Sequence, residues 1–313
     1  MKLLTFQYKK IARLGHITER NRIIDLASAS HGQLPDNMLE FLNRGEYNRL
    51  LAKKITANED LATLSLNQVK LLAPVTNPPS VRDGYTFRQH VVARRDGWGL
   101  DMIPEYDEFP VFYFTNHHAI TGPGDVSVME QHLDKLDFEF EVAVVIGRRG
   151  RNISAKDADE YIAGYTIMND WSARGIQAKE VKLTQGPSKS KDFATSMGPY
   201  MVIRDELQVF RIPGDHGERY DLPMTAVLNG EKVGEDNLKN MFWTFAQLIE
   251  RASYGADLFP GDIIGSGACR TGCLLEANAG GDGPQQWLKP DDVVELTVDG
   301  LGTLRNRIVQ NDH

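Results

Sequence analysis

The 313-residue sequence has very few cysteines, which excludes the small exported proteins that depend on several disulfides. Its two cysteines, Cys269 and Cys273, are four residues apart. An extended chain would separate their Cα atoms by about 13 Å, whereas a disulfide tolerates only about 7 Å. A zinc site would need two more soft ligands, which this stretch of sequence does not supply. We therefore expect two free thiols.

The sequence also lacks a long apolar segment and an excess of basic residues. No apolar run approaches the ~20 residues needed to span a bilayer, and residues 1–6 turn polar too soon for a secretory signal. We therefore expect a cytoplasmic protein that does not bind a membrane. Its 35 basic and 43 acidic side chains give a net charge of −8, which opposes general binding to nucleic acid. To bind anionic substrates, such a protein needs a metal ion or a few inward-pointing cations.

The first part of the chain, residues 1–74, is predicted to be a small β-rich domain. Short apolar runs predict strands, and helical periodicity follows over residues 37–54. The predicted strands cover residues 2–7, 11–14 and 23–26. Three prolines within residues 74–79 then prevent regular structure and are typical of a linker. We place the domain boundary near Pro74.

The remaining residues, 75–313, contain many short apolar runs divided by turn signals, which is typical of mostly β structure. Helical periodicity is clearest over residues 240–254, where the apolar positions indicate core packing. The pattern predicts a mostly β protein of the α+β class, with a small first domain and a larger second one.

The most informative segment covers residues 136–146, where apolar and polar residues alternate. On a single strand its three acids would share one face at a spacing of about 7 Å, with no Lys or Arg between them. These acids are Asp137, Glu139 and Glu141. The same face continues with Ala143 and Val145, so we expect it to enter the interior. A divalent cation such as Mg²⁺ or Ca²⁺ would remove the repulsion; an ordinary solvated acidic face is the alternative.

Two further acids occupy positions at which functional groups gather. An apolar run ends at Asp170, so a strand exit would expose this carboxylate, although Asp170 could equally cap a helix. Arg174 and Gln177 would lie on the following turn. Asp83 and His90 are seven residues apart, so a helix would direct both the same way at about 10 Å. They could then flank one cavity, with the carboxylate on a metal and the imidazole acting on water; alternatively, His90 is an ordinary surface or core histidine.

Three other segments leave their roles open. Lys191 lies in a tight loop, where it could meet an anion or be solvated. Glu276 follows an apolar, strand-like run, and the sequence does not fix its exposure. The glycine-rich residues 265–272 lack the Gly-Lys-Ser/Thr ending of a P-loop, so we expect no phosphate site there.

Taken in order, these motifs resemble the fumarylacetoacetate hydrolase family. The likeness runs from about Ser80 to the C-terminus, and residues 1–70 match only loosely. The motifs that carry it are Asp83 with His90, residues 137–141, residues 168–174, residues 186–193 with Lys191, residues 265–267, and the pair Leu275-Glu276.

The resemblance implies a mixed β-roll catalytic domain behind a small N-terminal β-rich domain, usually in a homodimer. It also implies a divalent metal, Mg²⁺ or Ca²⁺ with Mn²⁺ possible. The metal ligands by matching motifs are Asp83, Glu139, Glu141 and Asp170.

The same resemblance implies roles for the other site residues. His90 would activate water, Glu276 would orient or share its proton, and Lys191 would stabilise an oxyanion. The implied substrate contacts are Tyr113, Arg174 and Gln177.

The implied reaction is hydrolysis of a carbon–carbon bond in a small anionic diketo acid of the fumarylacetoacetate or acylpyruvate type. The leaving group departs as an enolate, whose charge a chelating dication disperses, while His90 provides general-base assistance. Two alternatives stay open: a 2-oxo acid decarboxylase, hydratase or isomerase on the same metal site, and a non-catalytic binding protein stabilised by the cation. Gly175, where the family usually has Asp, and Ala268, where threonine is common, leave the exact substrate open.

Overall fold

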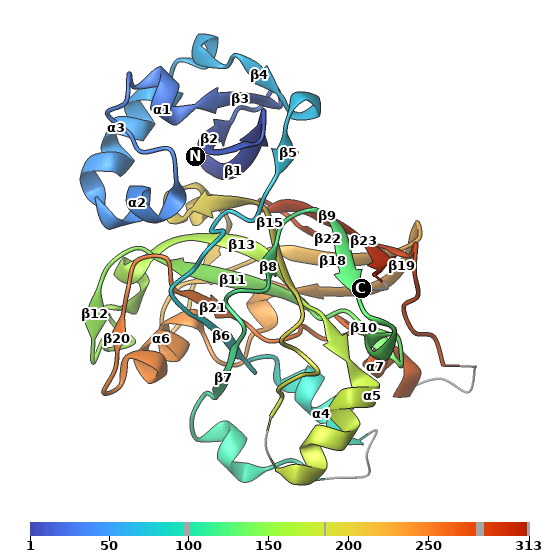
Figure 1. The fold of residues 1–313 in the computed structure, drawn as a ribbon. Helices are drawn as coiled ribbons and strands as arrows, with labels where there is room; N and C mark the ends of the chain where they lie inside the picture. The colour runs from blue at the N-terminus through green and yellow to red at the C-terminus, as the bar shows by residue number, and fades with distance from the viewer. Residues whose placement is uncertain (97–100, 185, 280–284, 312–313) are drawn as a thin grey trace.

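The computed structural model describes residues 1–96, 101–184, 186–279 and 285–311, and its centre is one large mixed sheet (Figure 1). The strands of this sheet are β1 (Lys2–Tyr8), β2 (Ile11–Ile17), β3 (Arg22–Asp25), β4 (Leu64–Ser65), β5 (Lys70–Leu71), β6 (Val81–Gly84), β7 (Phe112–Thr115), β8 (Ile120–Thr121), β11 (Phe140–Ile146), β13 (Ile162–Asp170), β15 (Thr195–Ile203) and β21 (Ile263–Gly265). Within the described ranges their order is β4-β3-β2-β1-β15-β13-β11-β21-β6-β7, with β5 beside β1 and β8 beside β15.

A second sheet packs on the large one and closes the main core. It contains β9 (Gly124–Val128), β18 (Pro223–Leu228), β19 (Glu231–Asn237), β22 (Val293–Val298) and β23 (Gly302–Gln310), in the order β19-β18-β22-β23-β9. Val142 and Val144 of β11 belong to the same buried cluster as Leu296 and Val298 of β22. The prediction of a mostly β, mixed fold is confirmed.

Short ribbons and helices complete the molecule. The two-stranded pairs are β10 (Leu136–Asp137) with β14 (Ser172–Ala173), β12 (Gly150–Arg151) with β20 (Asp257–Leu258), and β16 (Arg211–Ile212) with β17 (Arg219–Tyr220). The α-helices are α1 (Leu26–Ala29), α2 (Met38–Asn43), α3 (Glu46–Thr56), α4 (Arg88–Asp96), α5 (Arg174–Glu180), α6 (Phe245–Ser253) and α7 (Leu274–Ala279). Among the described residues, no helix is both long and apolar enough to cross a membrane.

The N-terminal part has the expected strands, but its helical region differs from the prediction. Two helices replace the single helix expected over residues 37–54, because Gly45 adopts a φ of 57° and breaks the helical path. Lys2 of β1 pairs with Val202 of β15, so this part of the chain extends the large sheet. Residues 72–80, where we expected a linker, contain no helix or strand. The domain boundary near Pro74 remains a prediction.

Helix α6 begins later than the sequence pattern indicated, and its start has a clear cause. Thr244 accepts a hydrogen bond from the Gln247 N–H, and the Gln247 side chain accepts one from the Thr244 N–H, which completes a capping box. The helix therefore begins at Phe245. Its Leu248 lies directly behind Gly84, where a Cβ would come within 3.1 Å of the leucine Cδ1.

The alternating segment at residues 136–146 folds as two strands instead of the single strand predicted. The Phe138 N–H donates to Asp137 Oδ1 at 2.9 Å, and the Glu139 N–H donates to Asn169 Oδ1 at 3.0 Å. Because side-chain oxygens accept these protons, backbone pairing is interrupted between β10 and β11. The expectation that the face continuing as residues 143 and 145 enters the interior is confirmed, since both side chains are fully buried.

Candidate active site

Five neighbouring strands of the large sheet bring the central groups of the site into one row. The row runs from Asp170 at the end of β13 through Glu141 in β11, Gly265 in β21 and Asp83 in β6 to Tyr113 in β7. The register pairs Gly265 with Asp83 and Asp83 with Tyr113. Residues far apart in the sequence therefore become direct neighbours through strand pairing.

This arrangement corrects two expectations and confirms a third. Asp83 lies on a strand, and α4 begins only at Arg88, so the condition of one helix through Asp83 and His90 is not met. Glu276 lies on α7, not after a strand. Asp170 ends β13 as predicted, and the N-cap of the following helix is Ala173, so the capping alternative for Asp170 is wrong.

The three carboxylates of this row form a buried cluster with Glu139, which directly precedes β11. One oxygen of each lies within 4.8 Å of the others. The members are Asp83, Glu139, Glu141 and Asp170. A Cβ at Gly265 would lie 2.8 Å from Asp83 Oδ1 and from Glu141 Oε2, so only glycine allows these carboxylates to approach. All four side chains are buried, which makes the alternative of a solvated acidic face wrong.

Burial and mutual repulsion strongly perturb these acids. Burial raises the pKa of Asp83, and the charge of Asp170 raises it further. Burial also raises the pKa of Glu141, with additional contributions from the charge of Asp83 and a hydrogen bond to it. The Gly267 N–H offsets part of this cost, because it donates to Glu141 Oε2 at 2.9 Å and to Asp83 Oδ1 at 3.2 Å.

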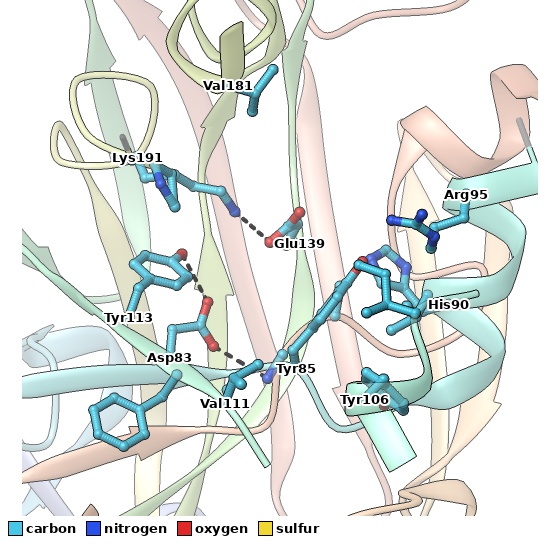
Figure 2. Close-up of a pocket in the computed structure, with 18 of the residues that line it drawn as sticks. Asp83, Tyr85, His90, Arg95, Tyr106, Val111, Tyr113, Glu139, Val181 and Lys191 are labelled. Atoms are coloured by element: carbon cyan, nitrogen blue, oxygen red, sulfur yellow. Dashed lines mark hydrogen bonds and ion pairs between the residues drawn. The ribbon is translucent and has the colours of Figure 1, made fainter. Parts of the chain in front are cut away.

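Lys191 and Tyr113 donate side-chain hydrogen bonds to the cluster. The Lys191 ammonium contacts Asp170 Oδ2 at 2.7 Å and also contacts Glu139 (Figure 2). Burial alone would lower the pKa of Lys191, but the charges of Asp170 and Glu139 outweigh it and raise the pKa. The Tyr113 hydroxyl donates to Asp83 Oδ2 at 2.9 Å and to Asp170. Lys191 is buried, so the alternative of a solvated lysine is wrong.

The cluster has the oxygen donors that a divalent cation requires, and two of these oxygens have no hydrogen-bond partner among the described residues. Glu141 Oε1 and Asp170 Oδ1 are buried and have no hydrogen-bond partner among the residues that the structure describes. Leaving such charged oxygens unsatisfied in a protein interior is costly. Because all the donors are oxygens, the set suits Mg²⁺, Ca²⁺ or Mn²⁺. The four residues fit a single dication.

A buried ion pair lies behind this cluster. The Arg174 guanidinium contacts Asp137 Oδ2 at 2.9 Å and Glu139 Oε1 at 2.8 Å, and it donates to Gln177 Oε1 at 3.0 Å. Asp137 also accepts the Leu274 N–H at 2.8 Å. Asp137 therefore points away from the cluster, and the expectation that three acids share one face is wrong for this residue.

The opposite wall of the site carries a histidine–carboxylate pair. His90 Nδ1 contacts Glu276 Oε1, and Glu276 Oε2 accepts the Thr271 N–H at 2.7 Å. The ring of Tyr85 meets the His90 ring edge-on, with centroids 5.9 Å apart. Figure 2 shows Tyr85 between this wall and the side that carries Asp83. His90 is buried, which makes the surface alternative for this histidine wrong.

Both walls face one cavity of about 640 Å³. Its polar lining includes Asp83, His90, Arg95, Glu105, Tyr113, Glu139, Gln177 and Lys191, and much of the remainder is apolar, with Val91, Ile103, Phe109 and Val111. Ala268 also lines it, so a side chain without a hydroxyl faces the ligand space there. Arg174 is not one of the described residues that line this cavity, because its guanidinium lies behind Glu139.

Some features of the site gave no usable signal in the sequence. The Gly267 N–H donates to Asp83 and Glu141 because β21, just before it, lies beside their strands, and no local pattern in the sequence indicates this contact. The sequence predicts two free thiols, and this prediction is confirmed, since both cysteines are free and buried. One ligand atom each of Cys273, His90 and Glu276 nevertheless lie within 4.8 Å of one another. Tyr85 differs from these residues: it lies two residues after Asp83, and this position next to a motif could have indicated that its ring contacts the site.

The comparison with known proteins agrees with this geometry. The family model described as "Fumarylacetoacetate (FAA) hydrolase C-terminal" matches residues 80–309. The chain belongs to the fumarylacetoacetate hydrolase family. The match begins at the residue from which we expected the likeness to run. The predicted family membership is confirmed.

Relatives in the fumarylacetoacetate hydrolase family span the whole chain. Oxaloacetate tautomerase YisK from Bacillus subtilis (strain 168) is 31% identical over 98% of this chain and 100% of its own length. Oxaloacetate tautomerase fahd2, mitochondrial, from Xenopus laevis is 29% identical over 99% of this chain and 90% of its own. The solved fumarylacetoacetate hydrolase from Exiguobacterium antarcticum has a TM-score of 0.75 at 26% identity, covering 99% of this chain and 100% of that one.

We predict that Glu141→Gln abolishes stabilisation of the protein by Mg²⁺ while the metal-free protein unfolds at the same or a higher temperature. Glutamine keeps the size of the side chain but removes one negative charge from a crowded cluster. Wild-type protein at 100 times its dissociation constant for Mg²⁺ should gain about 2.7 kcal/mol. Thermal unfolding with EDTA and with Mg²⁺ measures both effects. Glu276→Gln is the control and should keep the Mg²⁺ response; an unchanged response in Glu141→Gln would exclude this residue as a ligand.

We predict that Arg174→Met lowers the free energy of unfolding by about 3–5 kcal/mol, because it leaves the buried Asp137 without its counter-charge and leaves Glu139 with Lys191 alone. Urea denaturation measures the loss. Arg174→Lys keeps the charge and should lose less. A loss below about 1 kcal/mol, the scale of an exposed ion pair, would contradict a structural role for Arg174 behind the metal centre.

Proposed function

We propose that this protein is a divalent-metal-dependent keto–enol tautomerase of a small 2-oxo dicarboxylic acid of the oxaloacetate type. One observation carries the proposal: His90, which Glu276 contacts, lines the same cavity as Asp83 and Glu139 of the four-carboxylate cluster. Moving a proton between carbon and oxygen needs one group that accepts the proton and one that stabilises negative charge on oxygen. The names of the full-length relatives support this choice over the hydrolysis that the sequence motifs favoured.

The four carboxylates would hold Mg²⁺ or Mn²⁺, with Ca²⁺ possible. When bound, such a cation acts as a Lewis acid that lowers the free energy of a negatively charged substrate oxygen. Gln177 and Lys191 line the same cavity and can donate hydrogen bonds to the acid. Because its pKa is raised, Lys191 keeps its proton and supplies positive charge to the site.

His90 is the group best placed to carry the proton. Its Nδ1 is engaged by Glu276, which leaves Nε2 as the ring nitrogen that can accept a proton from the carbon next to the carbonyl. Glu276 is itself fixed by the Thr271 N–H, so the ring is held in one orientation. The imidazolium that forms would be stabilised by the Glu276 carboxylate and could return its proton to the substrate.

Carbon–carbon hydrolysis of a β-diketo acid is the second candidate, and the size of the cavity favours it. A volume of about 640 Å³ with apolar walls exceeds what a four-carbon diacid needs and would admit a longer acyl chain. In that reaction His90 would activate water in place of abstracting a carbon-bound proton. The two reactions differ in their products, so they can be separated directly.

The experiment measures the decay of enol-oxaloacetate by ultraviolet absorbance in the presence of Mg²⁺. We expect wild-type protein to accelerate the decay and His90→Ala to lower turnover by about 10²- to 10⁴-fold, the usual contribution of a general base. The exposed His118 provides the matched control, and His118→Ala should retain full activity.

Two results would contradict the proposal. Undiminished turnover by His90→Ala with metal bound would exclude His90 as the base. Cleavage of acylpyruvates in ¹⁸O-labelled water, with label in the released acid and no effect on enol-oxaloacetate, would establish the hydrolase in its place.

A further inference from the structure

A second set of metal-ligating side chains lies behind the catalytic cavity and differs from the carboxylate cluster. It consists of His90 on α4, Cys273 just before α7 and Glu276 on α7, with one ligand atom of each within 4.8 Å of the others. The His90 and Glu276 side chains are 2% and 5% exposed, and Cys273 is 2% exposed. One nitrogen, one sulfur and one oxygen donor therefore converge in a protected place.

The sulfur donor determines which cation fits this set. Mg²⁺ and Ca²⁺ take oxygen ligands, whereas Zn²⁺ takes cysteine sulfur, histidine nitrogen and carboxylate oxygen in tetrahedral sites. Zinc bonds of about 2.0–2.3 Å place neighbouring tetrahedral ligands about 3.3–3.8 Å apart. His90 Nδ1 and Glu276 Oε1 contact each other directly and would move apart to that spacing, and no ligand atom of the set lies more than about 1 Å beyond it.

The charges of the set also suit a dication in a buried site. Binding would release the Cys273 thiol proton to solvent, because a coordinating thiol is deprotonated by zinc. The thiolate and the Glu276 carboxylate then balance the two positive charges, with His90 neutral. A complex without net charge avoids the large cost of an unpaired buried charge.

The set lies between two cavities that give access to it. His90 lines the main cavity of about 640 Å³. Glu276 lines a neighbouring cavity of about 290 Å³, and Gln177 and Val181 line both. A water molecule from either side can provide the fourth ligand that three protein donors leave open in a zinc site.

We propose that His90, Cys273 and Glu276 form a zinc site that inhibits the enzyme. A zinc ion bound there occupies the imidazole and the carboxylate that move the proton, so the protein with Mg²⁺ on its carboxylate cluster becomes inactive. The inhibition rests on the proposed function, whereas the zinc site itself does not.

Cobalt serves as the spectroscopic probe of this site in the full-length protein saturated with Mg²⁺. Co²⁺ bound to a thiolate produces a sulfur-to-cobalt charge-transfer band, which an all-oxygen site cannot produce. We expect this band in wild-type protein, its displacement by one equivalent of Zn²⁺, and its absence in Cys273→Ala. Cys269→Ala, at the other buried cysteine, should keep the band.

Zinc inhibition is measured on the same proteins by their turnover of enol-oxaloacetate. Removal of one ligand should raise the inhibitory Zn²⁺ concentration by about 100-fold or more, since even residues behind metal ligands change affinity by 10- to 100-fold. Circular dichroism verifies that both cysteine variants are folded. If Cys273→Ala does not fold, the wild-type measurement still tests the proposal, because absence of the charge-transfer band from wild-type protein would contradict it.

Equal inhibition of wild-type protein and Cys273→Ala would also overturn the proposal, because zinc would then act at another site, such as the carboxylate cluster. Absence of turnover by wild-type protein would reject the proposed function, while the cobalt band would still decide on the zinc site.

Discussion

The repulsion among buried carboxylates is the constraint on which the rest of this site depends. Among the described residues at the metal centre, the four acids of the cluster and Asp137 face two buried cations, Lys191 and Arg174. Burial disfavours each of these charges. The excess of carboxylates over cations therefore favours binding of a further positive charge at the cluster. A dication would supply that charge, and under the proposed function the bound ion would act as a Lewis acid on a substrate oxygen.

The sheet determines where these charges meet. Strands β13, β11, β21, β6 and β7 are neighbours, so one row of residues comes from segments that are distant in the sequence, such as those of Asp83 and its partner Gly265. Gly265 in the middle strand leaves the space that the flanking carboxylates occupy. Helix α4 then brings His90 to the other side of the same cavity (Figure 2), where Glu276 of α7 contacts it. Under the proposed function, this separation of the metal ligands from His90 would suit any substrate that forms an enolate.

Sequence patterns predicted the parts of this arrangement that depend on local periodicity. Alternation placed Glu141 on the face that continues with Ala143 and Val145, and the end of an apolar run identified Asp170. Pairing between distant segments leaves no local signal: the strand position of Asp83 and the proximity of Cys273 to His90 follow from contacts across the fold. Alternation also misassigned Asp137, because Arg174 and the Leu274 N–H hold it away from the cluster. The roles of the site residues came from the family resemblance, not from periodicity.

Anomalous diffraction from a crystal grown with Mn²⁺ tests the central claim most directly. The account predicts one strong peak about 2.0–2.6 Å from carboxylate oxygens of Asp83, Glu139, Glu141 and Asp170. It also predicts that the Lys191 ammonium no longer contacts both Glu139 and Asp170. A peak at any other place, or none with the cluster still paired to Lys191, would contradict the account.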